Sequence, residues 1–123
     1  MTTQTAMNIL IIINDAPYGT EKAYNALRLA MSLQNDHPDV HVRMFLMADA
    51  VACGLPGQNT PQGYYNIERM VKSIVTKGGE VSSCGTCLDA RGLAGLTLVG
   101  GVRRGTMKEL AGWSVEADRV FTF

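Results

Sequence analysis

The fold class is decided by the stretch Met7–Ile13, which reads MNILIII. It is rich in branched residues and apolar on both faces, as is typical of a central strand in a parallel sheet with helices on both sides. The polar, Gly- and Pro-containing segment Asn14–Gly19 ends this strand. The rest of the chain is therefore expected to supply further parallel strands and the helices that connect them.

Four further segments are predicted to be strands. Val40–Met47 is mostly apolar on both faces, and Glu80–Ser83 is a short strand that runs directly into Cys84. Leu96–Val99 is a brief apolar run between glycines, and Arg119–Phe123 closes the chain. Strands that alternate with helical patterns indicate a largely parallel sheet with right-handed crossovers and helices on both faces.

Helical patterns fill the connections between these strands. One helix is predicted over residues 20–36, with Thr20 as its N-cap. A second is predicted to open at Thr60-Pro61 and to end at Gly78-Gly79. A short helical turn is expected over Asp49–Cys53, and Thr106–Glu109 fits a capping box at the start of a last helix.

Length and composition bound the function. The 123 residues are the size of one domain, which we place at 7–123 behind a flexible tail at 1–6. The 11 basic and 11 acidic side chains give no field that would attract nucleic acid or a membrane surface. We read no export signal and no membrane-spanning segment, so the three cysteines are expected to be free thiols in a reducing cytoplasm.

The loops that leave the carboxyl ends of parallel strands gather at one edge of the sheet, where open α/β proteins place their ligands. Cys84 is predicted to lie at that edge, together with Asp15–Tyr18 and Asp49–Thr60. His37 and His41 fall on the opposite edge. The candidate site is therefore built around Cys84.

The segment Cys84-Gly85-Thr86-Cys87 is the strongest chemical signal in the chain. A short helix is expected to start there, with Thr86 as its cap and Asp89 three positions later. Its N–H groups, with the charge of Arg91, would favour the thiolate, which is the reactive form of cysteine. The alternative is that Cys84 and Cys87 are small residues that pack a turn.

Several other residues are weaker candidates for the site. Asp15, Tyr18 and Asp49 are second-tier candidates, although short Asp residues after strands usually cap turns. For Cys53, buried packing is the favoured reading. Arg103-Arg104 is interpreted as a solvated basic turn outside the site, and a zinc site is rejected because the histidines fall on the wrong edge.

Two segments give the sequence a resemblance to a known family. They are CGTCLDARGL at Cys84–Leu93, and the tail from Met107–Leu110 through Trp113 to Ala117–Phe123. The chain resembles the DsrE/DsrF-like family over nearly its whole length. Weaker matches are the stretches 7–19, 49–51 and 60–66.

The resemblance implies an α/β fold, a three-layer α/β/α sandwich with a mainly parallel sheet of about five strands. It also implies assembly into trimers or hexamers, and a role in passing persulfide sulfur between proteins. In TusD-like members the sulfur-carrying cysteine stands seven residues ahead of an Arg-Gly pair, here Arg91-Gly92, and the matching position is Cys84. Cys87 departs from members with one active cysteine: it either resolves an oxidised Cys84 or only packs.

The first hypothesis is therefore a cytoplasmic, sulfurtransferase-like sulfur carrier that needs no cofactor or metal and meets donor and acceptor proteins. The second is a redox switch or assembly module, in which Cys84 and Cys87 form a disulfide without carrying sulfur. A homo-oligomer is also expected, because 46% hydrophobic and 18% charged residues leave apolar surface for a partner. The loop Cys53–Asn59 is the candidate rim of a site shared with a neighbouring subunit.

Overall fold

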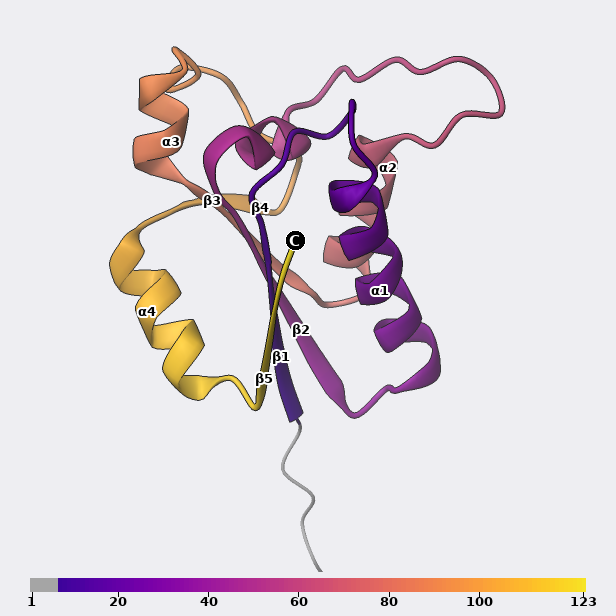
Figure 1. Ribbon diagram of the computed structural model, residues 1–123, viewed down its shortest axis with the longest axis vertical. Coiled ribbons are helices and arrows are strands. Elements are labelled where there is room, and N and C mark those ends of the chain that lie inside the picture. Colours follow the sequence, from indigo (N-terminus) through magenta and orange to yellow (C-terminus); the bar gives the residue numbers. More distant parts are fainter. Residues whose placement is uncertain (1–6) are drawn as a thin grey trace, which may run out of the picture.

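The computed structural model describes residues 7–123, so the tail expected at residues 1–6 lies outside the described part of the chain. A single sheet of five parallel strands runs through its centre in the order β4-β3-β2-β1-β5 (Figure 1). The strands are β1 (Met7–Ile13), β2 (Val40–Leu46), β3 (Glu80–Cys84), β4 (Val102–Gly105) and β5 (Arg119–Thr122). The helices are α1 (Lys22–Asp36), the 3-10 helix η1 (Ala48–Gly54), α2 (Ile67–Thr76), α3 (Gly85–Ala90) and α4 (Met107–Glu116).

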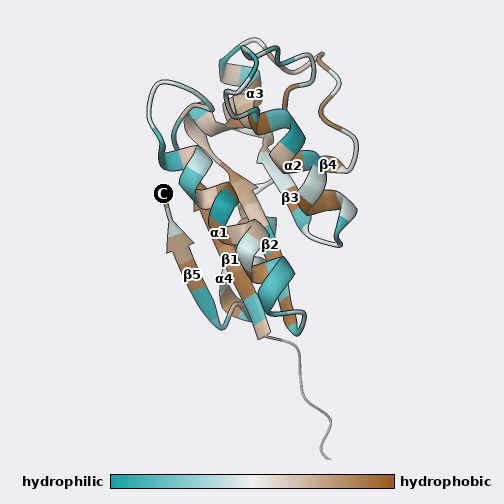
Figure 2. Ribbon diagram, turned by 90° about the vertical axis from the view of Figure 1, so that its right-hand side faces the viewer, coloured by the Kyte–Doolittle hydropathy of each residue, from teal (hydrophilic) through white to brown (hydrophobic). Residues whose placement is uncertain are grey.

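Helices cover both faces of the sheet, so the chain is a three-layer α/β/α sandwich, as predicted. Helices α1 and α2 lie on one face, and α3 and α4 lie on the other (Figure 1). Successive side chains of β1 serve the two faces in turn: Ile9 and Ile11 pack under α1 and α2, whereas Leu10 packs with Trp113 of α4. The apolar character of the central strands is visible in Figure 2.

The first strand has the central position that its apolar pattern predicts. It pairs with β2 along its whole length, from Met7 opposite Val40 to Ile13 opposite Leu46, and with β5 on its other side. The expected strand at the end of the chain and the cap at Thr106, whose hydroxyl accepts from the N–H of Glu109, are also confirmed. No helix within residues 7–123 is long and apolar enough to cross a membrane.

The fourth strand was predicted at the wrong place. Leu96–Val99 is a loop, in which Leu96 is 53% exposed and the Val99 N–H donates to the carbonyl of Gly54 at 2.7 Å. The strand is Val102–Gly105, which pairs with β3 from Val81 opposite Val102 onward. Val99 lies in a loop, and its side chain packs into the hydrophobic core. Its apolar character reflects this packing rather than a position in a strand.

Two helix starts also differ from the predictions. Helix α2 begins at Ile67, not at Thr60-Pro61, because Asn66 caps it by accepting the N–H of Arg69 and Gly63 has φ +84°. Residues 55–66 are a loop instead. Helix α1 begins at Lys22, and its N-cap is Glu21 instead of the predicted Thr20.

Candidate functional site

The carboxyl ends of the strands meet at one edge of the sheet, and Cys84 lies there as the last residue of β3. Cys84 is itself the N-cap of α3, because its Sγ accepts the backbone N–H of Cys87 at 3.4 Å. The predicted cap, Thr86, is instead an exposed residue in the first turn of the helix, and that expectation was wrong. The sulfur of Cys84 is thus held by the first turn of the helix that follows it.

The second cysteine of the segment lies against the first. The Cys87 thiol lies close enough to Cys84 to influence its pKa, and Cys87 Sγ accepts the N–H of Ala48 at 3.3 Å. Ala48 has φ +51°, a left-handed conformation that non-glycine residues seldom adopt. The first residue of η1 is thus turned so that its N–H reaches the sulfur of Cys87, which joins the end of β2 to the cysteine segment.

Burial decides the acidity of Cys84, which is only 7% exposed. Burial is the largest influence and raises the pKa of Cys84 above the ordinary thiol value, and the hydrogen bond with the Cys87 thiol raises it further. The N–H groups of Cys87 and Thr86 lower the pKa without reversing its direction. The expectation that the helix start would produce a low pKa was wrong, because it ignored the loss of water around a buried sulfur.

Arg91 and Asp49 meet beside the cysteines, as the predicted sheet edge requires. Arg91 Nε lies 2.9 Å from Asp49 Oδ1, and its Nη1 donates to the Cys87 carbonyl at 3.1 Å. The Arg91 guanidinium therefore links η1 to the end of α3. Its charge is already paired with a carboxylate.

Arg104 is the residue near the site that sequence reasoning missed. It was interpreted as part of a solvated turn, but it lies in edge strand β4 with its guanidinium against Gly85. Its Nη2 lies 2.6 Å from Asp89 Oδ2 of α3. An arginine in the segment before the last helix was visible in the sequence, but its position beside Gly85 depends on the pairing of β4 with β3.

The other sequence candidates lie on the α1 and α2 face of the sheet. Cys53 is fully buried there, and burial raises its pKa to about 12. Tyr18 donates its hydroxyl to Gln58 and packs in the same cluster, while Asp15 pairs with Thr20 and Lys22. The structure thus brings Cys84, Cys87, Asp49, Thr86 and Arg91 together, and it places Asp15, Tyr18 and Cys53 elsewhere.

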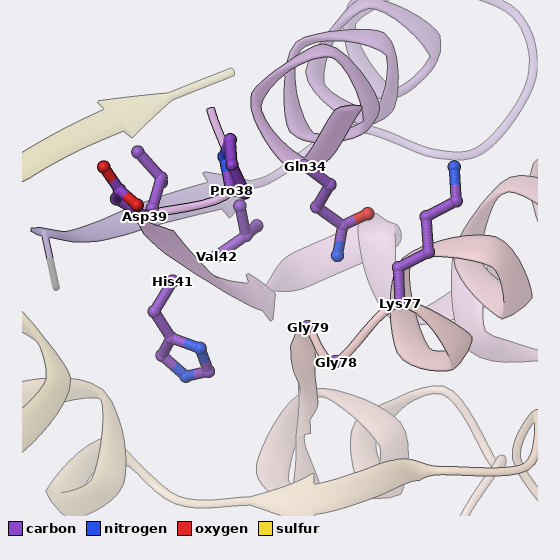
Figure 3. A pocket seen from close by; sticks show the side chains of 9 residues that line it. Gln34, Pro38, Asp39, His41, Val42, Lys77, Gly78 and Gly79 are labelled. Atoms are coloured by element: carbon purple, nitrogen blue, oxygen red, sulfur yellow. The ribbon is translucent and has the colours of Figure 1, made fainter. Parts of the chain in front are cut away.

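Two surface hollows lie away from the cysteines. One, of about 380 Å³, lies at the amino ends of β2 and β3, where Gln34, His41 and Lys77 surround it (Figure 3). His41 is on the edge opposite Cys84, as predicted, and contacts Glu80 at 2.5 Å. The other, of about 340 Å³, is formed by residues 58–64 with Asn66 and Arg69. Neither hollow includes a cysteine, and residues 7–123 contain no cluster of three potential metal ligands.

Comparison with known proteins gives consistent matches along the chain. The model of the DsrE/DsrF-like family matches residues 7–123. Protein YchN of Escherichia coli strain K12 is 45% identical over 115 residues, which cover 94% of this chain and 97% of YchN. An uncharacterized protein of Methanopyrus kandleri is 38% identical over 115 residues, covering 94% of this chain and 93% of that protein.

Solved structures agree with the sequence matches. The crystal structure of YchN from E. coli superposes with a TM-score of 0.91 at 44% identity, covering 95% of this chain and 99% of that one. A conserved protein of unknown function from Bacteroides thetaiotaomicron superposes with a TM-score of 0.66 at 14% identity, covering 99% and 100%. The second likeness concerns the fold alone.

Proposed function

The chain belongs to the DsrE/DsrF-like family, and from that premise we propose that it is a sulfur-relay protein that carries sulfur as a persulfide on Cys84. The observation that carries the proposal is the position of this sulfur. It ends a central parallel strand at the edge where α/β proteins hold their ligands, and its Sγ accepts the Cys87 N–H. The same N–H supports negative charge on Cys84 when the thiol ionises.

The receiving step is an exchange between sulfur atoms. The Cys84 thiolate attacks the outer sulfur of a persulfide on a donor protein, and a new S–S bond forms to Cys84 Sγ. The S–S bond of the donor breaks, its inner sulfur leaves as a thiolate, and the proton stays on the transferred sulfur. In delivery, an acceptor thiolate attacks that terminal sulfur and Cys84 leaves as a thiolate. Neither step consumes an oxidant or a reductant.

The surrounding residues hold this sulfur in place. Ala48 donates its N–H to Cys87 Sγ, and the Arg91–Asp49 ion pair ties η1 to α3. Burial of Cys84 keeps its resting thiol protonated, which protects it from small oxidants in the cytoplasm. Transfer then depends on a partner that reaches the edge where Cys84 lies.

Intact-mass measurement tests the proposal. After incubation with a protein persulfide donor, the wild type should gain the mass of one sulfur and Cys84→Ser should gain none. Cys53→Ser is the matched control, because Cys53 lies on the other face of the sheet and its loss should leave loading unchanged. Equal loading of wild type and Cys84→Ser would refute the assignment.

A second candidate function rests on the proximity of two thiols, that of Cys87 in α3 and that of Cys84, the N-cap of this helix. Mild peroxide would remove two electrons and two protons from Cys84 and Cys87 and leave a disulfide, with the peroxide reduced to water. The protein would then be a redox switch. Alkylation mapping after peroxide separates the two functions: a Cys84–Cys87 disulfide without any persulfide loading favours the switch.

We also propose that the protein works as a homo-oligomer with donor and acceptor proteins as partners. Of the predicted loop Cys53–Asn59, Cys53 and Gly54 belong to η1, and residues 55–59 leave η1 at the same edge as Cys84. Pro56 and Gly57 at its tip are exposed, and Gln58 holds it by bonds to the carbonyls of Cys53 and Leu55. A neighbouring subunit at this loop would restrict access to the cysteine edge.

A further inference from the structure

The guanidinium of Arg104 occupies the space beside Gly85, the residue that follows Cys84. A Cβ built on Gly85 would lie 2.8 Å from Arg104 Nε and 2.9 Å from its Cζ. Strand pairing fixes this position, because Ser83 lies opposite Arg104 and Cys84 lies opposite Gly105. The absence of a side chain at Gly85 thus lets a permanent positive charge approach the peptide that carries the candidate sulfur.

An acidic partner holds Arg104 in this position. Asp89 of α3 lies 2.6 Å from Arg104 Nη2, and both side chains are about half exposed. The hydrogen bond with Asp89 is the largest influence and raises the pKa of Arg104, and the charge that Cys84 would carry as a thiolate acts in the same direction. Arg104 therefore responds to Cys84 as well as to Asp89.

The other polar groups near Cys84 do not replace Arg104. Cys87 is hydrogen-bonded to Cys84, and Arg91 is paired with Asp49 of η1. The neighbouring Arg103 contacts Glu109 at 3.1 Å, and its guanidinium lies over the Trp113 ring of α4. The two adjacent arginines of β4 thus serve different parts of the molecule.

We propose that Arg104 is the positive charge that supports Cys84 in its anionic forms, first as the thiolate that accepts sulfur and then as the ionised persulfide. Asp89 fixes the guanidinium and partly offsets its charge. The inference rests on the proposed function for the persulfide. Its electrostatic part is testable without any sulfur donor.

The rate of Cys84 alkylation by iodoacetamide, resolved by peptide mass and measured against pH, tests the inference. Arg104→Gln should move the midpoint of the rate–pH profile to higher pH and lower the alkylation rate at pH 7 by about threefold to tenfold, after allowance for solvent screening. Arg103→Gln is the matched control and should leave the profile unchanged.

Gly85→Ala provides a variant that keeps every charge. Its methyl group would displace the guanidinium of Arg104, and the alkylation midpoint should rise as it does in Arg104→Gln. High salt should shrink the difference between Arg104→Gln and wild type. An unchanged profile in Arg104→Gln, or an equal shift in Arg103→Gln, would overturn the inference.

Persulfide loading of the same variants separates this inference from the proposed function. A wild type that loads sulfur, combined with no shift in Arg104→Gln, refutes the role of Arg104 and leaves sulfur carriage standing. A shift in the alkylation profile of Arg104→Gln, combined with no loading of the wild type, refutes sulfur carriage and confines Arg104 to support of the Cys84 thiolate.

Discussion

Replacement of Gly105 by alanine should destabilise the protein, because Gly105 lies where β3, β4 and α4 meet. An added Cβ would overlap with Ser82 Oγ and would lie 2.8 Å from Glu109 Oε1 and 3.0 Å from Phe45 Cε2. Ordinary contacts between carbon atoms are about 3.5–4.0 Å. Since all three neighbours belong to the packed interior or its border, the methyl group has no open direction.

The size of the effect follows from two contributions. Overpacking of a buried position costs about 1–3 kcal/mol. Rotation of the Ser82 hydroxyl away from the new methyl group would also break its hydrogen bond to Glu109, at a cost of roughly 1 kcal/mol. The free energy of unfolding should therefore fall by about 2–4 kcal/mol, which lowers the Tm by roughly 8–16 °C for a domain of this size.

Urea unfolding followed by circular dichroism measures this change. Gly112→Ala is the matched control, because Gly112 is exposed within α4, has no atom within 4 Å of its added Cβ, and should gain about 0.5–1 kcal/mol. Ser82→Ala removes the oxygen that the new methyl group would overlap, so the double variant Ser82→Ala/Gly105→Ala should be less destabilised than the sum of the single changes. Simple additivity, or no loss in Gly105→Ala, would contradict the reasoning.

Three further predictions concern acidity and assembly. Cys87→Ala should lower the pKa of Cys84, because it removes a hydrogen bond that raises this pKa. Site-resolved alkylation of Cys84 at pH 7 should then be about twofold to fivefold faster, whereas Cys53→Ala should leave the alkylation rate of Cys84 unchanged. Slower alkylation in Cys87→Ala would contradict the prediction. Burial alone would raise the pKa of Glu68, but the N–H of Gln58 and the charge of Lys72 outweigh burial, and the pKa is lowered. The contribution of Glu68 to stability is therefore present above about pH 4.3 and is lost as the pH falls through the pKa of the folded state. Urea unfolding between pH 6 and pH 3 should therefore show a weaker acid loss in Glu68→Gln, and an equal loss would refute the assignment. Light scattering at micromolar concentration should give a multiple of 13.3 kDa, and a monomer mass would defeat the predicted assembly.

Long, strongly apolar segments could be predicted from the sequence, because their burial depends little on partners. Met7–Ile13 is apolar on both faces, and only the centre of a covered sheet can bury such a strand. Edge strand β4 lacks this signal. Its Arg103 and Arg104 are exposed, and Val102–Gly105 is a strand because its backbone pairs with the edge of β3. That pairing is a long-range event without a local pattern.

The start of α2 shows a second limit of local patterns. Thr60-Pro61 has the chemistry of a helix start, yet tertiary bonds determine the outcome. Gln58 accepts the hydroxyl proton of Tyr18, and its own N–H donates to Glu68 at 2.9 Å. These bonds keep the residues before Asn66 in a loop, and the helix begins after Asn66, its N-cap.

The candidate site divides in the same way. Cys84 could be placed at the carboxyl edge because it directly follows a strand, and Asp49 and Arg91 follow from the same topology. The acidity of Cys84 could not be predicted, since it depends on burial by residues distant in the sequence. Arg104 was missed for the same reason that β4 was missed.

The opposition between burial and charge at Cys84 has a consequence for sulfur carriage. Burial raises the pKa of Cys84, whereas the N–H groups of Cys87 and Thr86 lower it, and in the proposal above the guanidinium of Arg104 beside Gly85 also favours the anion. A site with burial alone would never ionise readily, and one with charge alone would expose a reactive thiolate to every oxidant. The ion pair with Asp89 offsets part of the charge of Arg104 and also holds its guanidinium beside Gly85, so the proposed support of the Cys84 anion depends on both residues.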